Sequence, residues 1–162
     1  MIRRLKQLLR DRAGTATIEL ALAAPILATM VIGVTDISIA YGKKLELEQA
    51  AQRAMEKVMQ TTGEDTPEAT IQKEAVCQYN GTATDGTCLT SPITTANVTV
   101  TYSLRCNGTV TAYTQDCVAG ETEVRYITAT VTDKYKPMFD MHFGTQSDGT
   151  YHLTGAAGVR VA

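Results

Sequence analysis

The sequence has few large aromatic side chains. It contains no tryptophan and only two phenylalanines among its 162 residues. A folded domain built from these residues has a small core, and small cores depend on covalent links for stability. The length fits one membrane anchor followed by one small domain.

Histidine is also scarce, and no two cysteines are close together. His142 and His152 are the only histidines, and neither belongs to a recognisable nucleophile or metal-binding motif. Zinc sites use tight pairs such as C-x2-C, whereas the cysteines here are spaced C-x10-C twice. We therefore predict no catalytic, cofactor-binding or metal site, and we expect that the protein is not an enzyme.

Positive charge is in excess only at the N-terminus. Residues 1–14 hold five basic side chains and one acidic side chain, and the other 148 residues carry a net charge of −6. A nucleic-acid-binding protein concentrates positive charge on its folded part. The charge distribution therefore excludes nucleic acid as a partner.

A long apolar segment follows the basic N-terminus. Between residues 20 and 42 the only charged side chain is Asp36. About 20 apolar residues in a helix span the roughly 30 Å hydrocarbon core of a membrane. The basic residues before the segment and the acidic sequence after it predict a cytoplasmic N-terminus and contact with membrane lipid. A cleaved signal peptide is disfavoured, because the segment is too long and no A-x-A site follows it.

An amphipathic helical pattern continues directly from the apolar segment. Its apolar positions recur at helical spacing, so one helix from Ala16 to Gln60 is predicted, with a stop near Gly63. The apolar stripe consists of Leu47, Ala50, Ala51, Ala54 and Val58. We expect this stripe to pack against a sheet formed by the rest of the chain.

Three residues of the anchor need an explanation. Glu19 either sits at the interface or has a functional partner, because a carboxylate at membrane depth is unfavourable. Pro25 removes a helix hydrogen bond and is expected to kink the helix. Asp36 is either an interfacial residue or a charge that binds a partner, and the sequence does not distinguish these alternatives.

The distal part of the chain predicts an α+β domain. Thr66-Pro67-Glu68 is typical of a helix start, and a short helix is expected over 67–76. Alternating apolar and polar residues predict antiparallel strands near 98–104, 127–132 and 151–161. The fold class is therefore α+β, with a long N-terminal helix packed on a small antiparallel sheet.

The cysteines are expected to form disulfides. An even cysteine count beyond a membrane segment is typical of an oxidising compartment. Four cysteines allow three pairings, and the repeated spacing together with the strand positions favours Cys77 with Cys88 and Cys106 with Cys117. Each bridge is expected to contribute about 2–4 kcal/mol.

The segment from Met138 to Phe143 is unusually apolar. It is either a partner-docking patch or a buried strand or loop. We favour the buried interpretation.

The segment Gly14-Thr15-Ala16-Thr17-Ile18-Glu19 looks like a type IV pilin processing site. The longer run through Pro25, Gly33 and Asp36 to Gln49-Ala50-Ala51-Gln52-Arg53-Ala54 resembles the TadE-like family, the minor pseudopilins of the tight-adherence (Flp) pilus. The resemblance covers about residues 12–55. Leu20 departs from the Tyr of major Flp pilins, which are also much shorter, so the resemblance indicates a minor subunit.

The resemblance implies a processed, membrane-bound assembly protein. A prepilin peptidase would remove the cytoplasmic leader 1–14 by cutting between Gly14 and Thr15, and Glu19 would pair with the new N-terminal amine of a neighbouring subunit. Residues 15–62 would form the helix and 63–162 a periplasmic domain at the bacterial inner membrane or in the pilus. The expected partners are the peptidase, other pilins and pseudopilins, and the inner-membrane assembly platform.

Two other functions fit the sequence less well. A pseudopilin of a type II secretion machine is disfavoured by the early proline and the Ala-Ala-x-Arg-Ala segment. A signal-anchored periplasmic binding domain would need a pocket with converging polar groups, and the sequence contains no sign of one.

Overall fold

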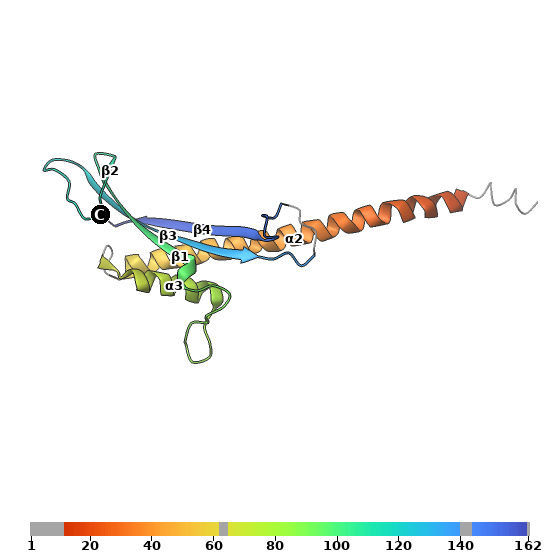
Figure 1. Cartoon of the computed structure of the whole chain (residues 1–162), viewed down its shortest axis with the longest axis horizontal. Helices are drawn as coiled ribbons and strands as arrows, with labels where there is room; N and C mark the ends of the chain where they lie inside the picture. The colour runs from red at the N-terminus through yellow and green to blue at the C-terminus, as the bar shows by residue number, and fades with distance from the viewer. Residues whose placement is uncertain (1–11, 62–64, 140–143, 162) are drawn as a thin grey trace, which may run out of the picture.

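The long predicted helix is present and extends well beyond the remainder of the molecule. The computed structural model describes residues 12–61, 65–139 and 144–161, with side chains from Ala16 onward. Helix α2 (Arg12–Gln60) continues through Pro25 without a break. Its N-terminal part projects freely, whereas its C-terminal part lies along the sheet (Figure 1). Gly63, the expected stop, lies outside the described residues.

The sheet has four antiparallel strands in the order β2-β1-β3-β4. The alternating segments form β1 (Val98–Cys106), β3 (Glu123–Tyr135) and β4 (Tyr151–Arg160). The short strand β2 (Thr109–Thr111) was not predicted, and it pairs with the end of β1. The α+β architecture predicted from the sequence is therefore confirmed.

Both helices of the domain cover one face of the sheet. Helix α2 packs on β4 and β3, and α3 (Glu68–Asn80) lies beside α2 and contacts β1 (Figure 1). A 3-10 turn, η2 (Thr95–Asn97), leads into β1. The core between helices and sheet includes Leu47, Ala51, Ala54, Val58, Ile71, Ala75, Val98, Val100, Ile127, Ala129 and Val131. The predicted stripe of α2 is thus buried as expected, because apolar side chains spaced by one helical turn share one face.

The sequence predicted α3 over 67–76, but the helix is longer. It continues to Asn80 and ends at Gly81, whose φ of 83° suits glycine. The Asn80 side chain then donates hydrogen bonds to the carbonyls of Leu89 (2.8 Å) and Ile93 (2.7 Å). These bonds fold the following loop back onto the end of α3.

Two disulfides link the domain, with the pairing that the spacing favoured. Cys77 and Cys88 have their Cα atoms 4.7 Å apart, and those of Cys106 and Cys117 are 5.5 Å apart. Both separations are usual for disulfides. The first bridge closes the loop after α3, and the second ties the end of β1 to the connection before β3.

Candidate functional site

The N-terminal half of α2 is an exposed apolar rod. Between residues 16 and 35 no described side chain is buried. The large apolar side chains that are more than half exposed here are Ile18, Leu20, Leu22, Ile26, Leu27, Met30, Val31 and Val34. Among the described helices, α2 from Ala16 onward is the one long and apolar enough to cross a membrane. A single-pass membrane anchor is consistent with this helix.

Hydroxyl groups in this part of α2 are bonded within the helix. Thr29, Thr35 and Ser38 donate to the carbonyls of Ile26, Val31 and Val34 at 2.7–2.8 Å. Bonding back to the preceding turn satisfies each hydroxyl donor without water. These polar residues are therefore compatible with a lipid environment.

The predicted processing and assembly residues lie along this rod. Gly14 and Thr15 belong to the first turns of α2, where the structure describes the backbone only. Glu19 is exposed among the apolar side chains, one turn further along. The structure thus places the proposed cut and the carboxylate on one continuous helix, and their roles stay predictions.

Asp36, whose role the sequence did not decide, forms hydrogen bonds within the chain. Its Oδ1 and Oδ2 accept hydrogen bonds from the backbone N–H groups of Met138 (2.9 Å) and Phe139 (3.2 Å). The side chain is only 4 % exposed. Hydrogen bonds to a carboxylate are among the stronger ones in proteins, so Asp36 fastens the connection between β3 and β4 to α2.

The position of Asp36 shortens the free part of the helix. The apolar segment was expected to span a membrane over residues 20–42, yet Asp36, Ala40 and Leu47 are buried against the domain. Asp36 is the first buried residue of α2 in the part of the chain that the structure describes. The domain therefore begins to cover α2 several residues before Gly42.

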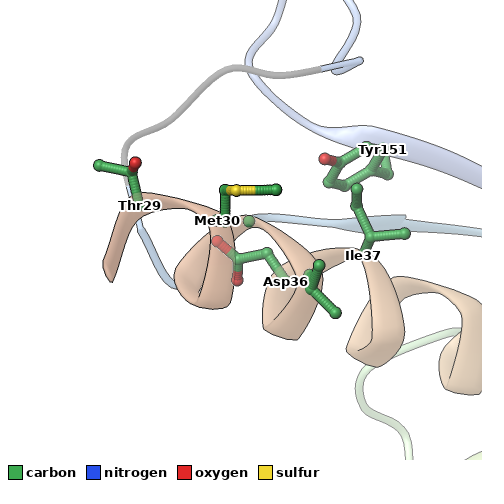
Figure 2. A pocket seen from close by; sticks show the side chains of 7 residues that line it. Thr29, Met30, Asp36, Ile37 and Tyr151 are labelled. Carbon is green, nitrogen blue, oxygen red and sulfur yellow. The ribbon is translucent and has the colours of Figure 1, made fainter. Parts of the chain in front are cut away.

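An apolar cleft lies between α2 and the start of β4. Figure 2 shows Met30 and Ile37 of α2 and Tyr151 of β4 on the same side of the helix. The cleft has a volume of about 450 Å³ and is lined by Thr29, Met30, Gly33, Val34, Asp36, Ile37 and Tyr151. It is open on one side, at the level where the free rod meets the domain.

The apolar segment that begins at Met138 is exposed where it is described. Met138 is 72 % exposed and Phe139 is 40 % exposed. The favoured interpretation of a buried strand or loop is therefore wrong for these two residues, because their backbone is held on α2 while their side chains face outward. The remainder of the segment, residues 140–143 with His142, lies outside the described residues.

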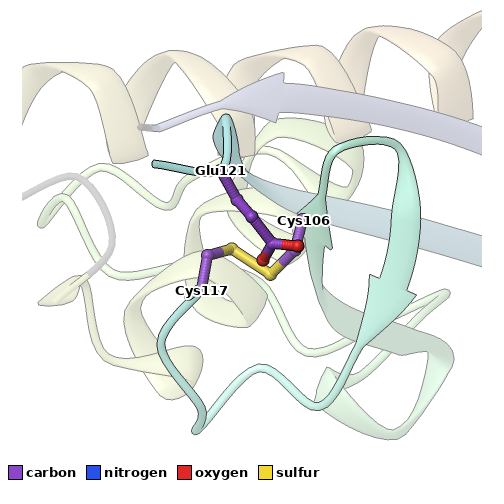
Figure 3. Close-up of side chains that lie close together, drawn as sticks. All are labelled: Cys106, Cys117 and Glu121. Atoms are coloured by element: carbon purple, nitrogen blue, oxygen red, sulfur yellow. A yellow bond between two sulfur atoms is a disulfide. The ribbon is translucent and has the colours of Figure 1, made fainter. Parts of the chain in front are cut away.

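Among the residues that the structure describes, one cluster of cysteine and acidic side chains is close enough to suggest a metal site. It consists of Cys106, Cys117 and Glu121 (Figure 3). The two sulfur atoms are bonded to each other, so neither is a thiolate ligand. Glu121 instead accepts a hydrogen bond from the N–H of Val118 at 3.1 Å, which shapes the connection before β3.

His152 lies in an ion cluster near the start of β4. Its Nε2 is 2.8 Å from Oδ2 of Asp148, which also binds Lys134 at 2.9 Å. Hydrogen bonds from His152, Lys134 and Thr150 hold the pKa of Asp148 well below its usual value. The cluster joins the end of β3 to the start of β4.

Comparison with known proteins identifies the N-terminal segment. The family model of TadE-like proteins matches residues 14–55. The match covers the predicted cut, Glu19, the exposed rod and the first part of the buried stripe, and it stops before α3. Neither a curated protein nor a solved structure matches the chain. Residues 14–55 of this chain are thus similar to TadE-like proteins, the similarity that the sequence predicted.

Proposed function

We propose that the protein is a minor pseudopilin of a tight-adherence (Flp) pilus, with a structural role and no enzymatic activity of its own. The observation that carries this proposal is the exposed apolar rod within the TadE-like segment, continuous with the helix that supports the sheet. A subunit that only needed a membrane anchor would not require a single rigid helix from anchor to domain. A subunit that packs beside other helical subunits would require one continuous helix from anchor to domain.

The proposed topology puts the leader in the cytoplasm and the domain in the periplasm of a bacterial cell. Five basic residues within 1–14 favour a cytoplasmic N-terminus. Two disulfides favour an oxidising compartment for the domain. A prepilin peptidase would then meet the bond between Gly14 and Thr15 at the cytoplasmic surface, where glycine allows a close approach to the backbone.

Glu19 supplies the proposed assembly contact. Processing would create an amine on Thr15, four residues before Glu19 on the same helix. When subunits pack side by side, the carboxylate of one can pair with the amine of its neighbour. A buried charge without a partner is unfavourable, so this pairing would select one axial register for the subunit in the pilus or at the assembly platform.

The test is to replace Glu19 by Gln in cells where this gene is the only copy. Glu19→Gln keeps the side-chain shape and removes the charge, so membrane levels should stay normal while pilus formation falls strongly. Glu56→Gln is the matched control, since Glu56 lies on an exposed turn of the same helix beyond the rod. Normal piliation with Glu19→Gln would refute the proposed role. Loss of the protein from the membrane would instead assign Glu19 to stability.

A further inference from the structure

The turn that follows β3 presents apolar side chains to the outside. It consists of Pro137, Met138 and Phe139, and we refer to these three residues as the foot. Met138 and Phe139 are 72 % and 40 % exposed. Apolar side chains presented together on a turn are typical of contact with a partner or a lipid surface. The contacts of the foot with α2 indicate whether it meets a partner protein or a lipid surface.

The backbone of the foot is prepared for a dry environment. The N–H groups of Met138 and Phe139 donate to the carboxylate of Asp36 at 2.9 Å and 3.2 Å. In water these groups would find solvent partners without help. In a membrane an unsatisfied N–H is strongly unfavourable, and irregular backbone is tolerated only where its polar groups are bonded. Asp36 provides that bonding.

The foot is also at the height where a membrane surface is expected. This step rests on the proposed function, in which the rod is a membrane anchor. Residues 16–35 form about 30 Å of helix, which equals the thickness of the hydrocarbon core. Asp36 is the next residue, and a carboxylate is far less costly at the edge of the core than inside it. The foot, bound to Asp36, lies at the same edge.

Residues near the level of the foot along α2 have the chemistry of a membrane interface. Tyr41 is 61 % exposed on α2 a little more than one turn beyond Asp36, and Tyr151 lines the cleft next to the rod. Lys136 is exposed directly before Pro137. Tyrosines at both membrane surfaces form aromatic belts, and lysines there reach the headgroups.

We propose that the foot is a lipid-contacting element, in which Met138 and Phe139 enter the periplasmic leaflet at the boundary of headgroups and acyl chains. The cleft between Thr29 and Ile37 opens at the same level, and acyl chains of that leaflet fill it (Figure 2). The domain is thereby seated on the membrane in a fixed orientation before assembly. Asp36 is the positioning residue that holds the foot at this height.

The chain offers a clean probe, because it contains no tryptophan. Three single-tryptophan variants of the full chain are reconstituted in vesicles of phosphatidylcholine and phosphatidylglycerol with or without dibrominated acyl chains, which quench tryptophan. Phe139→Trp reports on the foot. Val31→Trp reports on the rod, where Val31 is 65 % exposed. Val118→Trp is the negative control, since Val118 is 73 % exposed in the connection before β3, away from the rod.

Brominated lipid should quench Phe139→Trp and Val31→Trp strongly and leave Val118→Trp unchanged. Adding Asp36→Ala should lower the quenching of Phe139→Trp toward the level of Val118→Trp, and it should leave the quenching of Val31→Trp as it was. If Phe139→Trp does not fold, judged by its disulfides, Met138→Trp takes its place.

The outcomes separate the two proposals. Quenching of Val31→Trp without quenching of Phe139→Trp would overturn the lipid contact and leave the anchor intact. An unquenched Val31→Trp would overturn the membrane anchor and the foot together. Emission of Phe139→Trp that shifts only at high protein density, without lipid quenching, would identify a second copy of the chain as the occupant and contradict the proposal.

Discussion

Gly155 lets strand β4 lie directly against helix α2. It is buried in β4, where it pairs with Val131 of β3. A Cβ atom placed on Gly155 would be 2.6 Å from the carbonyl oxygen of Leu47 and would also overlap the adjoining backbone of the helix. The neighbouring atoms are backbone rather than flexible side chain, so the helix itself would have to move.

Gly155→Ala should therefore destabilise the domain by about 1–3 kcal/mol, as overpacking of a close contact does. Gly42→Ala is the matched control. Nothing lies within 4 Å of a Cβ at Gly42, and alanine in a helix is better than glycine by about 1 kcal/mol. Thermal unfolding of the full chain in detergent micelles measures both. A Gly155→Ala variant as stable as the wild type would contradict this expectation, because it would show that the helix can shift with little loss in the free energy of unfolding.

The close approach at Gly155 could have been predicted from the sequence. Gly155 interrupts the apolar register of Leu153, Ala157 and Val159. A glycine at an inward position of a strand often marks a close backbone approach. Asp36 had no comparable signal, because its partners Met138 and Phe139 are about a hundred positions away and contribute only backbone N–H groups.

Tyr79 joins three secondary-structure elements. It lies on α3, and its hydroxyl donates to Oδ2 of Asp133 on β3 at 2.7 Å. The amino group of Lys43 on α2 lies 5.5 Å from the centre of its ring. Burial, and then the hydrogen bond to Asp133, raise the pKa of Tyr79 well above its ordinary value. The folded state therefore favours the protonated phenol.

Tyr79→Phe should lower the free energy of unfolding by about 0.5–1.5 kcal/mol near pH 7, the usual net value of one hydrogen bond. The pKa of Tyr79 is raised on folding, so its contribution is complete below the unfolded pKa of about 10 and is lost as the pH rises above it. The difference between wild type and variant should therefore shrink in alkali.

Denaturant unfolding from pH 7 to 11 measures this effect. Tyr126→Phe, which removes a phenol hydroxyl from the exposed face of β3, is the control. A difference between wild type and Tyr79→Phe that stays constant or grows above pH 10 would contradict the assigned hydrogen bond.

The main elements could be predicted because their patterns are long. The helical spacing over 47–58 and the alternation in β1, β3 and β4 each repeat several times. Strand β2 has three residues, too few to show a period, and it forms because the turn at Asn107-Gly108 returns the chain to β1. The prediction from the sequence ended α3 at residue 76 and so missed its last turn. The helix ends where Gly81 takes a positive φ, and this backbone angle is visible only in the structure.

The whole molecule consists of a rod and a domain that share one helix (Figure 1). The rod lies within the TadE-like segment, and the rest of the domain is fastened to α2 at Asp36 and, further along the helix, at Leu47 opposite Gly155. Because no flexible linker separates the two within 16–60, a displacement of the rod would be transmitted directly to the domain. This continuity suits the proposed function, in which the helix would pack beside the helices of other subunits.

A pseudopilin is expected to lose its leader to a prepilin peptidase. The most direct measurement is the intact mass of the protein extracted from membranes of cells with an active prepilin peptidase. The mass should correspond to a chain that begins at Thr15, without residues 1–14, and it should revert to the full length when the peptidase gene is deleted. A chain that keeps Met1 in the presence of the active peptidase would contradict the account.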